Sequence, residues 1–392
     1  MLQLFHLDAG RKFFGVPALK SILDTMGESG FTHFQLYLTD NQGFRLALED
    51  MTLTTSFGTF DLTPCLGDGY CEGPKSPSGC GKFHTAADLE EILAYAKSKG
   101  ISVIPVINMP GHMGCILEKF PHLRYPHSRS SIDLTRPECQ EFALKILEKY
   151  ADFFAARGCT HMSFGADEFA NDIAPGYPDE IIMGFDRLYH EGGMEHFVTF
   201  FNAAAKVILD RGMTPVAFHD GVYYHSDKKY GEMDNRVMLC HWIDGWDTYI
   251  TARPDFLRQE GFQLINSPQR IYCGMGPRNW QERAEKAAAF DPFIFEKNQY
   301  NQNGNYAYLD TQVNKSIGKK APCEYFADAL KQCETKEIVC GSITDLELLK
   351  ANLAANCIPF SVCTMDHTKY EEFLSVRRSL MAAKIKNYYY SL

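Results

Sequence analysis

The sequence predicts an α/β protein, a single (β/α)8 barrel over residues 1–392 with long loops at the carboxyl-terminal face of the barrel. Three observations favour this fold. Eight short apolar runs alternate for the most part with segments of helical spacing, and no Pro/Ser-rich linker or change of composition divides the chain. Polar residues also follow most of the apolar runs, as they do at the functional face of such barrels.

The elements follow one another along the chain. Strands are expected at residues 4–9, 34–39, 101–108, 161–166, 214–220, 236–242, 262–267 and 337–345. Helices are expected at residues 17–29, 86–99, 138–157, 195–211, 252–260, 324–333, 346–355 and 368–388. Glycines at 100, 158, 212 and 261 each stand between a helix and the next strand, where a left-handed helix cap belongs. The least regular connection runs from residue 268 to residue 323.

Charge and hydropathy exclude some classes of partner. The formal net charge is −10 and no long basic run is present, which argues against nucleic acid or an anionic membrane as a partner. No apolar run approaches the roughly 20 residues of a membrane span. The first residues lack the pattern of a signal peptide, so the chain as it stands is expected to be cytoplasmic. If it were cut from a longer protein, it would be secreted or displayed at the cell surface.

Cysteine usage favours free thiols. The chain has 13 cysteines without regular spacing, an odd number that suits reduced thiols better than a disulfide framework. Cys65, Cys71 and Cys80 share one Gly/Pro-rich loop, but their spacing does not match that of zinc ligands. We therefore expect loop thiols there, with a metal site as the less favoured alternative.

An adjacent acid pair stands out within "FGADEFAND", residues 164–172. Asp167 and Glu168 follow an apolar run at a predicted strand end. Other strand ends carry further polar or aromatic residues: Asp8, Arg11, Asp40, Asn108, His112, His219, Asp220 and Trp242. Carboxylates among aromatic rings suit a sugar, whose apolar face stacks on the rings while its hydroxyls take charged hydrogen bonds. The alternative is an ordinary acidic pair at the start of a helix.

Four segments in order resemble the catalytic barrel of family 20 glycoside hydrolases, the β-N-acetylhexosaminidases. They are "LDAGRKFF" (7–14), "LTDNQGFRL" (38–46), "IPVINMPGH" (104–112) and "FGADEFAND". Residues 217–229 and 240–266 resemble the streptococcal surface exo-β-N-acetylglucosaminidase branch. The resemblance implies a TIM barrel that hydrolyses terminal β-linked GlcNAc or GalNAc from an oligosaccharide or glycoconjugate, with no cofactor and no metal.

The resemblance also implies a division of labour between the two acids. Glu168 would protonate the glycosidic oxygen and later activate water, while Asp167 would orient the substrate's 2-acetamido group as the nucleophile. For both to reach one sugar, the backbone has to leave regular strand geometry at this point. A regular strand there would contradict this interpretation.

Further positions are carried over from the same family. Arg11 matches an arginine that binds sugar hydroxyls, and Asp40 and His112 match positions beside the general acid. The remaining candidates for substrate binding are His219, Trp242, Trp246, Tyr272 and Asp345. The chain departs from the family after the predicted eighth strand, where Ile343 replaces a tryptophan and Asp345 is the only evident acid.

Three alternatives stay open at the level of sequence. A conventional retaining glycosidase would use an enzyme carboxylate as nucleophile, but it needs two carboxylates on different strands, which an adjacent pair fits poorly. The departures leave the terminal sugar open, so a lacto-N-biosidase or an enzyme specific for a substituted GlcNAc would fit as well. A noncatalytic glycan-binding barrel would keep Arg11 and the aromatic residues but would have no need for both acids.

Overall fold

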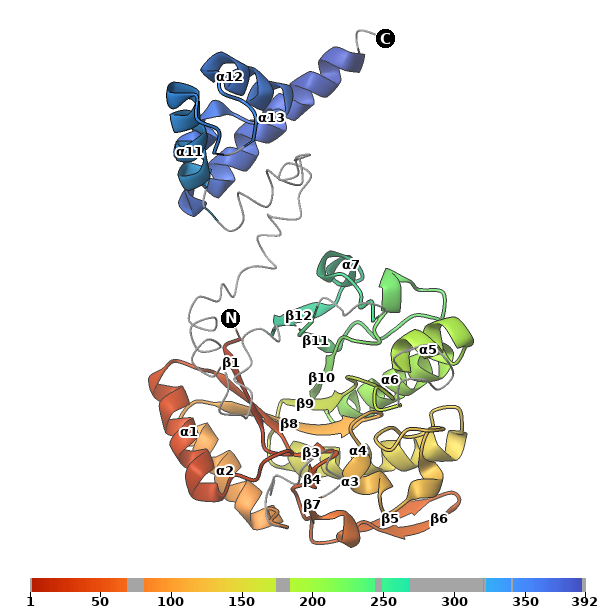
Figure 1. Cartoon of the computed structure of the whole chain (residues 1–392). Helices are drawn as coiled ribbons and strands as arrows, with labels where there is room; N and C mark the ends of the chain where they lie inside the picture. Colours follow the sequence, from red (N-terminus) through yellow and green to blue (C-terminus); the bar gives the residue numbers. More distant parts are fainter. Residues whose placement is uncertain are drawn as a thin grey trace. The chain divides into compact units, whose positions relative to one another are not determined.

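The computed structural model describes residues 2–68, 81–173, 184–243, 249–267, 320, 322–339 and 341–389. The chain forms two compact units, Met1–Phe290 and Asp291–Leu392. Figure 1 shows a sheet with flanking helices in the first unit and helices in the second. The described sheet lies wholly within the first unit, whereas the sequence predicts one barrel over residues 1–392.

The main sheet has seven parallel strands whose spatial order follows the chain. They are β1 (Leu4–Asp8), β2 (His33–Tyr37), β8 (Ser102–Met109), β9 (His161–Gly165), β10 (Thr214–Phe218), β11 (Met238–His241) and β12 (Gln263–Asn266). Parallel neighbours in chain order, joined by helices, are the arrangement of an α/β barrel. The first seven predicted strands are thus confirmed.

Helices connect most of these strands (Figure 1). They are α1 (Val16–Glu28), α2 (Ala86–Ser98), α3 (Gly114–Leu117), α4 (Pro137–Ala156), α5 (Gly184–Glu191), α6 (Met194–Leu209) and α7 (Pro254–Gln259). Local sequence explains their starts: Thr85 and Asp88 form a capping box before α2, and Pro137 occupies the first turn of α4. Gly158 after α4 has φ +78°, as the predicted left-handed cap requires.

Short strands fill the connection between β2 and α2. A small antiparallel sheet contains β3 (Thr39–Asp40), β4 (Gly43–Phe44) and β7 (Gly67–Asp68), and a hairpin contains β5 (Thr52–Thr55) and β6 (Gly58–Asp61). The fully buried Arg45 pairs with Asp68 at 2.8 Å and donates to the Gly10 carbonyl at 3.1 Å. This cation therefore ties the small sheet to the loop that follows β1. The described part of the first unit also contains the short 3-10 turns η1 (Thr63–Cys65), η2 (Pro121–Leu123) and η3 (Tyr224–Ser226).

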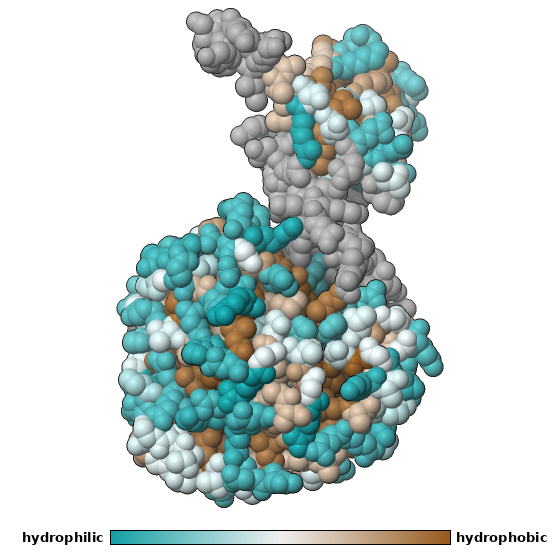
Figure 2. Space-filling view, turned by 180° about the vertical axis from the view of Figure 1, so that it is seen from behind, coloured by the Kyte–Doolittle hydropathy of each residue, from teal (hydrophilic) through white to brown (hydrophobic). Residues whose placement is uncertain are grey.

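The described residues of the first unit form an apolar core between the sheet and its helices. Its largest fully buried side chains include Tyr150, Phe142, Phe154, Phe164 and Phe197. Hydrophilic residues cover much of the face seen in Figure 2, with apolar patches between them. In the part of the chain that the structure describes, no helix combines the length and apolar character needed to cross a membrane.

The second unit is helical where it is described. It contains α11 (Pro322–Thr335), α12 (Leu346–Ala355), the 3-10 turns η6 (Phe360–Thr364) and η7 (His367–Lys369), and α13 (Tyr370–Tyr389). A separate small core holds these elements together, formed by Phe326, Cys333, Leu349, Leu353, Val362 and Cys363. The described cysteines of both units are free thiols.

The predicted eighth strand at 337–345 is wrong. Its described residues form a loop between α11 and α12, in which Ile338 is 72% exposed and Val339 is 62% exposed. A strand of a parallel barrel is covered on both faces, so an exposed apolar pair cannot belong to one. The β-branched residues of this run are typical of a strand, but the sequence alone does not show that they are exposed.

Candidate active site

The chain leaves regular strand geometry where β9 ends. Gly165 has φ +75°, Ala166 has φ +73° and Glu168 has φ +47°. The pairing of β8 with β9 also shifts register just before this point. Because neighbouring side chains point to opposite faces only in a regular strand, this turn allows Asp167 and Glu168 to face one site. The irregular backbone expected at the acid pair is confirmed.

One buried histidine brings the two acids together. His112 Nε2 lies 3.1 Å from Glu168 Oε2 and 3.3 Å from Asp167 Oδ2. The other ring nitrogen, Nδ1, lies 3.5 Å from Asp40 Oδ2. The structure therefore joins four of the predicted site residues in one group around a single imidazole.

Asp167 is held from a second side by the end of β8. Asn108 Nδ2 donates a hydrogen bond to Asp167 Oδ1 at 2.8 Å and another to the Tyr37 hydroxyl. Each oxygen of the Asp167 carboxylate thus has its own N–H partner, Asn108 or His112, which fixes the orientation of the carboxylate. Asn108 is one of the polar residues that the sequence places at predicted strand ends, but no specific role is predicted for it. Tyr37 is not predicted to act in the site.

Arg11 joins the group through two other acids. Its Nη1 lies 2.7 Å from Asp8 Oδ2, and its Nη2 lies 3.1 Å from Asp40 Oδ2. The Arg11 side chain is 37% exposed, whereas that of Asp40 is 1% exposed. Arg11 can therefore meet a ligand from solvent, while Asp40 can act only through Arg11 and His112.

Electrostatics make the centre of the site an ion pair. Burial by itself would lower the pKa of His112, but the charges of Asp167 and Asp40 raise it well above its usual value. Burial would raise the pKa of Asp167, but the charge and hydrogen bond of His112 hold it below its usual value. Burial raises the pKa of Asp40 to about 6 against the opposing charges of Arg11 and His112. At neutral pH, Asp167 is therefore an anion beside an imidazolium.

Asp220 supports the backbone of the general-acid candidate. Its Oδ2 accepts hydrogen bonds from the Glu168 backbone N–H at 3.1 Å and from the Tyr249 hydroxyl at 2.9 Å, and its Oδ1 accepts from Trp242 Nε1. Burial and the charge of Asp167 raise the pKa of Asp220 to about 8, against the opposing hydrogen bond from Trp242. Trp242 thus orients Asp220 with its indole N–H. No sequence signal pointed to Tyr249.

The predicted contact between His219 and the sugar is contradicted. The His219 side chain is fully buried, stacks on His241 with ring centroids 4.0 Å apart, and its Nδ1 lies 3.2 Å from the Cys240 carbonyl oxygen. Burial and the neighbouring His241 lower the pKa of His219 well below its usual value. His219 is therefore a neutral packing residue, because a side chain with no exposed surface offers nothing to a sugar.

Three predicted residues do not join the described group. Trp246 and Tyr272 lie outside the described residues. Asp345 belongs to the second unit, where its side chain accepts a hydrogen bond from the Leu348 backbone N–H at 3.0 Å and caps α12. The predicted strand-end role of Asp345 is wrong, since the run before it is not a strand.

The same side chains offer ligand atoms that could hold a metal ion. His112, Asp167 and Glu168 each present one such atom, and these atoms lie within 4.8 Å of one another. His112 already pairs with both carboxylates, at 3.3 Å from Asp167 and 3.1 Å from Glu168, an arrangement that also suits proton transfer and charge stabilisation.

Comparison with a sequence model of a protein family shows to which family this chain belongs. The model of the glycosyl hydrolase family 20 catalytic domain matches residues 4–323. The chain belongs to glycosyl hydrolase family 20. The matched range contains the whole described sheet and ends near the start of α11, so nearly all of the described helical unit follows it.

Curated relatives share the family at low identity. The chain is 26% identical over 296 residues to a β-hexosaminidase of Akkermansia muciniphila, a match that covers 70% of this chain and 54% of that protein. It is 22% identical over 246 residues to a lacto-N-biosidase of Bifidobacterium bifidum, which covers 60% of this chain and 20% of that protein. The chain thus spans about half or less of these two relatives.

Solved structures share the fold over nearly the full chain. A structure of the pneumococcal protein StrH superimposes with a TM-score of 0.65 at 24% identity, covering 97% of this chain and 98% of the other. A second structure, of a family 20 module of the pneumococcal exo-β-D-N-acetylglucosaminidase StrH, gives a TM-score of 0.63 at 22% identity. The similarity supports an α/β fold of the TIM-barrel type.

Proposed function

We propose that this glycoside hydrolase is an exo-acting β-N-acetylhexosaminidase that removes terminal β-linked GlcNAc or GalNAc. The observation that carries the proposal is the convergence of Asp167 and Glu168 on one nitrogen of His112. Two acids with different surroundings at one point are what substrate-assisted cleavage of a 2-acetamido sugar requires.

In the proposed reaction, Glu168 donates a proton to the glycosidic oxygen as the bond to the anomeric carbon breaks. The acetamide carbonyl oxygen of the substrate attacks the same carbon and forms an oxazolinium-type ring. Asp167 accepts the acetamide N–H, which orients the carbonyl and offsets the positive charge of the ring. Glu168 then takes a proton from water, which opens the ring and restores the original anomeric configuration.

The charge of Asp167 supports its part in this proposal. An anion is needed there from the start, and His112 keeps the pKa of Asp167 below its usual value despite burial. Arg11 lies on the other side of Asp40, and its side chain is 37% exposed. This cation would bind the hydroxyls of the terminal sugar.

The complete eight-stranded barrel with long loops at its carboxyl-terminal face is part of the proposal. Seven consecutive parallel strands support it. Because residues 337–339 and 341–345 form a loop, an eighth strand would have to come from another part of the chain.

The identity of the terminal sugar has a second candidate. The lacto-N-biosidase of Bifidobacterium bifidum is among the relatives, and Asp345 does not sit at a strand end to grip the sugar. An enzyme that releases lacto-N-biose or a substituted GlcNAc would use the same two acids. A matched series of aryl glycosides of GlcNAc, GalNAc and lacto-N-biose would rank these substrates directly.

The decisive assay compares two aryl glycosides. We expect 4-nitrophenyl β-N-acetylglucosaminide to be cleaved and the corresponding glucoside to resist, because the glucoside has no acetamide. A thiazoline mimic of the oxazoline should inhibit competitively. Equal cleavage of both glycosides, or no inhibition by the thiazoline, would contradict the substrate-assisted mechanism. No cleavage of any amino-sugar glycoside, together with measurable binding, would favour the noncatalytic glycan-binding alternative.

A further inference from the structure

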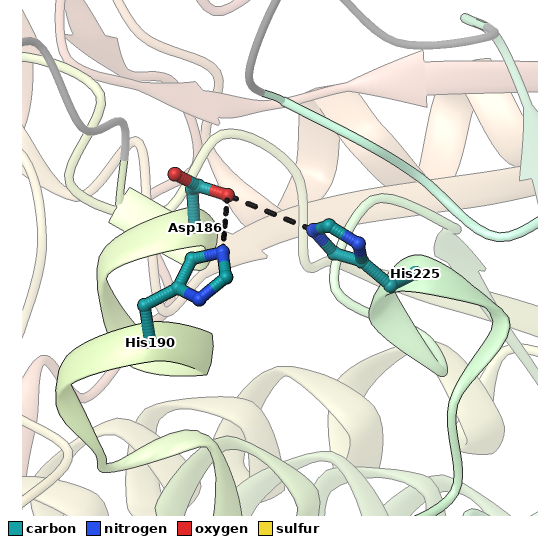
Figure 3. A group of neighbouring side chains, drawn as sticks. All are labelled: Asp186, His190 and His225. Carbon is teal, nitrogen blue, oxygen red and sulfur yellow. Dashed lines mark ion pairs between the residues drawn. The ribbon is translucent and has the colours of Figure 1, made fainter.

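A group of three metal-ligating side chains lies outside the catalytic group. Asp186 and His190 are one turn apart on α5, and His225 belongs to the 3-10 turn η3 after β10. Figure 3 shows both imidazoles directed at the Asp186 carboxylate. Residues four apart share one face of a helix, so α5 presents two of the three side chains together.

The separations of the ligand atoms suit a shared cation. Asp186 Oδ1 lies 3.5 Å from His190 Nε2 and 3.7 Å from His225 Nε2, and the ligand atoms lie within 4.8 Å of one another. These separations are too long for good hydrogen bonds. Ligand atoms about 2.0–2.1 Å from a tetrahedral zinc ion stand roughly 3.3–3.4 Å apart. From this juxtaposition we propose that Asp186, His190 and His225 bind a divalent transition metal such as Zn²⁺.

Two features hold the ligands in place before a metal binds. The His225 ring stacks on Tyr189 with centroids 4.5 Å apart and planes 11° apart, and the His225 backbone N–H donates to the Ile250 carbonyl at 3.0 Å. The side chain of Asp186 is only 7% exposed and also hydrogen-bonds with the Tyr224 side chain. Partners of this kind orient the ligands of a metal site.

The ring nitrogen of His225 supplies an independent indication. Its Nε2 is buried and has no hydrogen-bond partner within the described residues. A buried polar atom without a partner costs free energy, and coordination of a metal would remove that cost. His225 itself has φ +60°, so the turn holds this side chain in an uncommon backbone conformation.

The proposed site would fasten α5 to the turn after β10. Phe185, next to Asp186, packs on Phe197 with centroids 4.7 Å apart and lies 6.2 Å from the Tyr249 ring. The Tyr249 hydroxyl donates to Asp220, which in turn accepts the Glu168 backbone N–H. The metal would therefore stabilise the scaffold behind the catalytic group and take no part in bond cleavage.

Zinc binding to the full chain tests this proposal. The chain is freed of metal with a chelator and titrated with Zn²⁺ in competition with a chromophoric chelator, and Co²⁺ is used in parallel as a spectroscopic probe. The test variant is His190→Ala, whose side chain is 54% exposed and can be removed without opening the core. The control is His196→Ala, a 40% exposed histidine 3.9 Å from Glu195 that belongs to no cluster of three ligands among the described residues.

We expect one zinc equivalent per chain, a visible Co²⁺ spectrum of nitrogen and oxygen ligands, and a higher melting temperature with zinc. His190→Ala should weaken zinc binding by about 100-fold and abolish the zinc-dependent shift in melting temperature, while His196→Ala should retain both. Equal zinc affinity in the three proteins, no binding by the wild type, or a thiolate-type Co²⁺ spectrum that His190→Ala leaves unchanged would overturn the proposal. Circular dichroism establishes that each variant is folded.

Discussion

Asp167 and Glu168 are neighbours in sequence but differ in their surroundings. The side chain of Asp167 is 13% exposed and has N–H partners on both oxygens, whereas that of Glu168 is 28% exposed. A proton donor must reach the leaving group, and a group that orients the acetamide must stay fixed. The environments therefore match the proposed division of roles between the two acids.

Replacing Glu168 by glutamine tests its role as the acid. We expect kcat/KM for a GlcNAc disaccharide to fall by about 10²–10⁴-fold, because that leaving group needs a proton. For an activated aryl glycoside, the rate of the bond-breaking step should fall much less. That rate is measured from kcat/KM or from the pre-steady-state burst of released phenol. Equal losses for both substrates would mean that Glu168 is not the general acid.

Replacing Asp167 by asparagine should act differently. Attack by the acetamide accompanies departure of either leaving group, so kcat/KM should fall by a similar large factor for the disaccharide and the aryl glycoside. The two variants measured on the same substrate pair serve as controls for each other. Near-normal rates for Asp167→Asn would contradict its assigned role.

At the scale of elements, the end of β9 is fitted closely to the end of β8. A Cβ at Gly165 would collide with the amide of Asn108, the group that donates to Asp167. The close approach and the positive φ of Gly165 both require glycine. The geometry of the acid pair thus depends on how two strands pack as well as on the residues of one strand.

Gly165→Ala tests this dependence. The added methyl group should push the Asn108 amide off Asp167 and lower kcat/KM by about 10²-fold, the scale of a misplacement near 1 Å. Gly158→Ala is the matched control, because Gly158 also has positive φ, at +78°, but an added Cβ meets nothing within 4 Å. That control should lose about 1–2 kcal/mol of stability and keep its activity. Equal activity in the two variants would contradict the coupling of β8 to the acid pair.

Asp345 tests the corrected assignment of residues 337–345. Asp345 caps α12, so Asp345→Ala should lower the free energy of unfolding by about 1 kcal/mol. Urea unfolding followed by circular dichroism measures this change. kcat/KM should change by less than twofold. A large rise in KM without a change in stability would instead support the predicted contact between Asp345 and the sugar.

At the scale of the whole molecule, the buried charges of the site make stability depend on pH. The folded-state pKa of His112 is raised well above its usual value, and that of Asp220 is raised to about 8. A raised pKa means that the folded chain holds a proton that the unfolded chain releases. Each group therefore contributes its full share to the free energy of unfolding below its pKa in the unfolded chain, which is about 6.5 for histidine and 3.9 for aspartate. That contribution is lost as the pH rises through the pKa of the group in the folded chain.

We expect the free energy of unfolding to fall as pH rises from 7 to 8, by at most about 1.4 kcal/mol per pH unit for each proton. Urea unfolding followed by tryptophan fluorescence measures this in the first unit, since all three tryptophans, Trp242, Trp246 and Trp280, precede Asp291. His112→Gln should reduce the slope. Stability that stays constant or rises over this range would contradict the assigned pKa directions.

Much of this molecule follows from local sequence patterns. The first seven strands, the main helices, the glycine caps and the position of the acid pair all come from short-range chemistry, because apolar periodicity and cap residues act within a few residues of the chain. The motifs around Arg11, His112 and Asp167 also suffice to indicate the family.

Only the tertiary structure decided what each side chain contacts. Asn108, Tyr249 and Asp220 support the acids through hydrogen bonds between different strands and loops, and His219 is removed from the site by burial. The exposed run at Ile338 and Val339 has the composition of a strand without its burial. Residue type sets which interactions a side chain can make, whereas burial and partners depend on packing between segments far apart in the sequence.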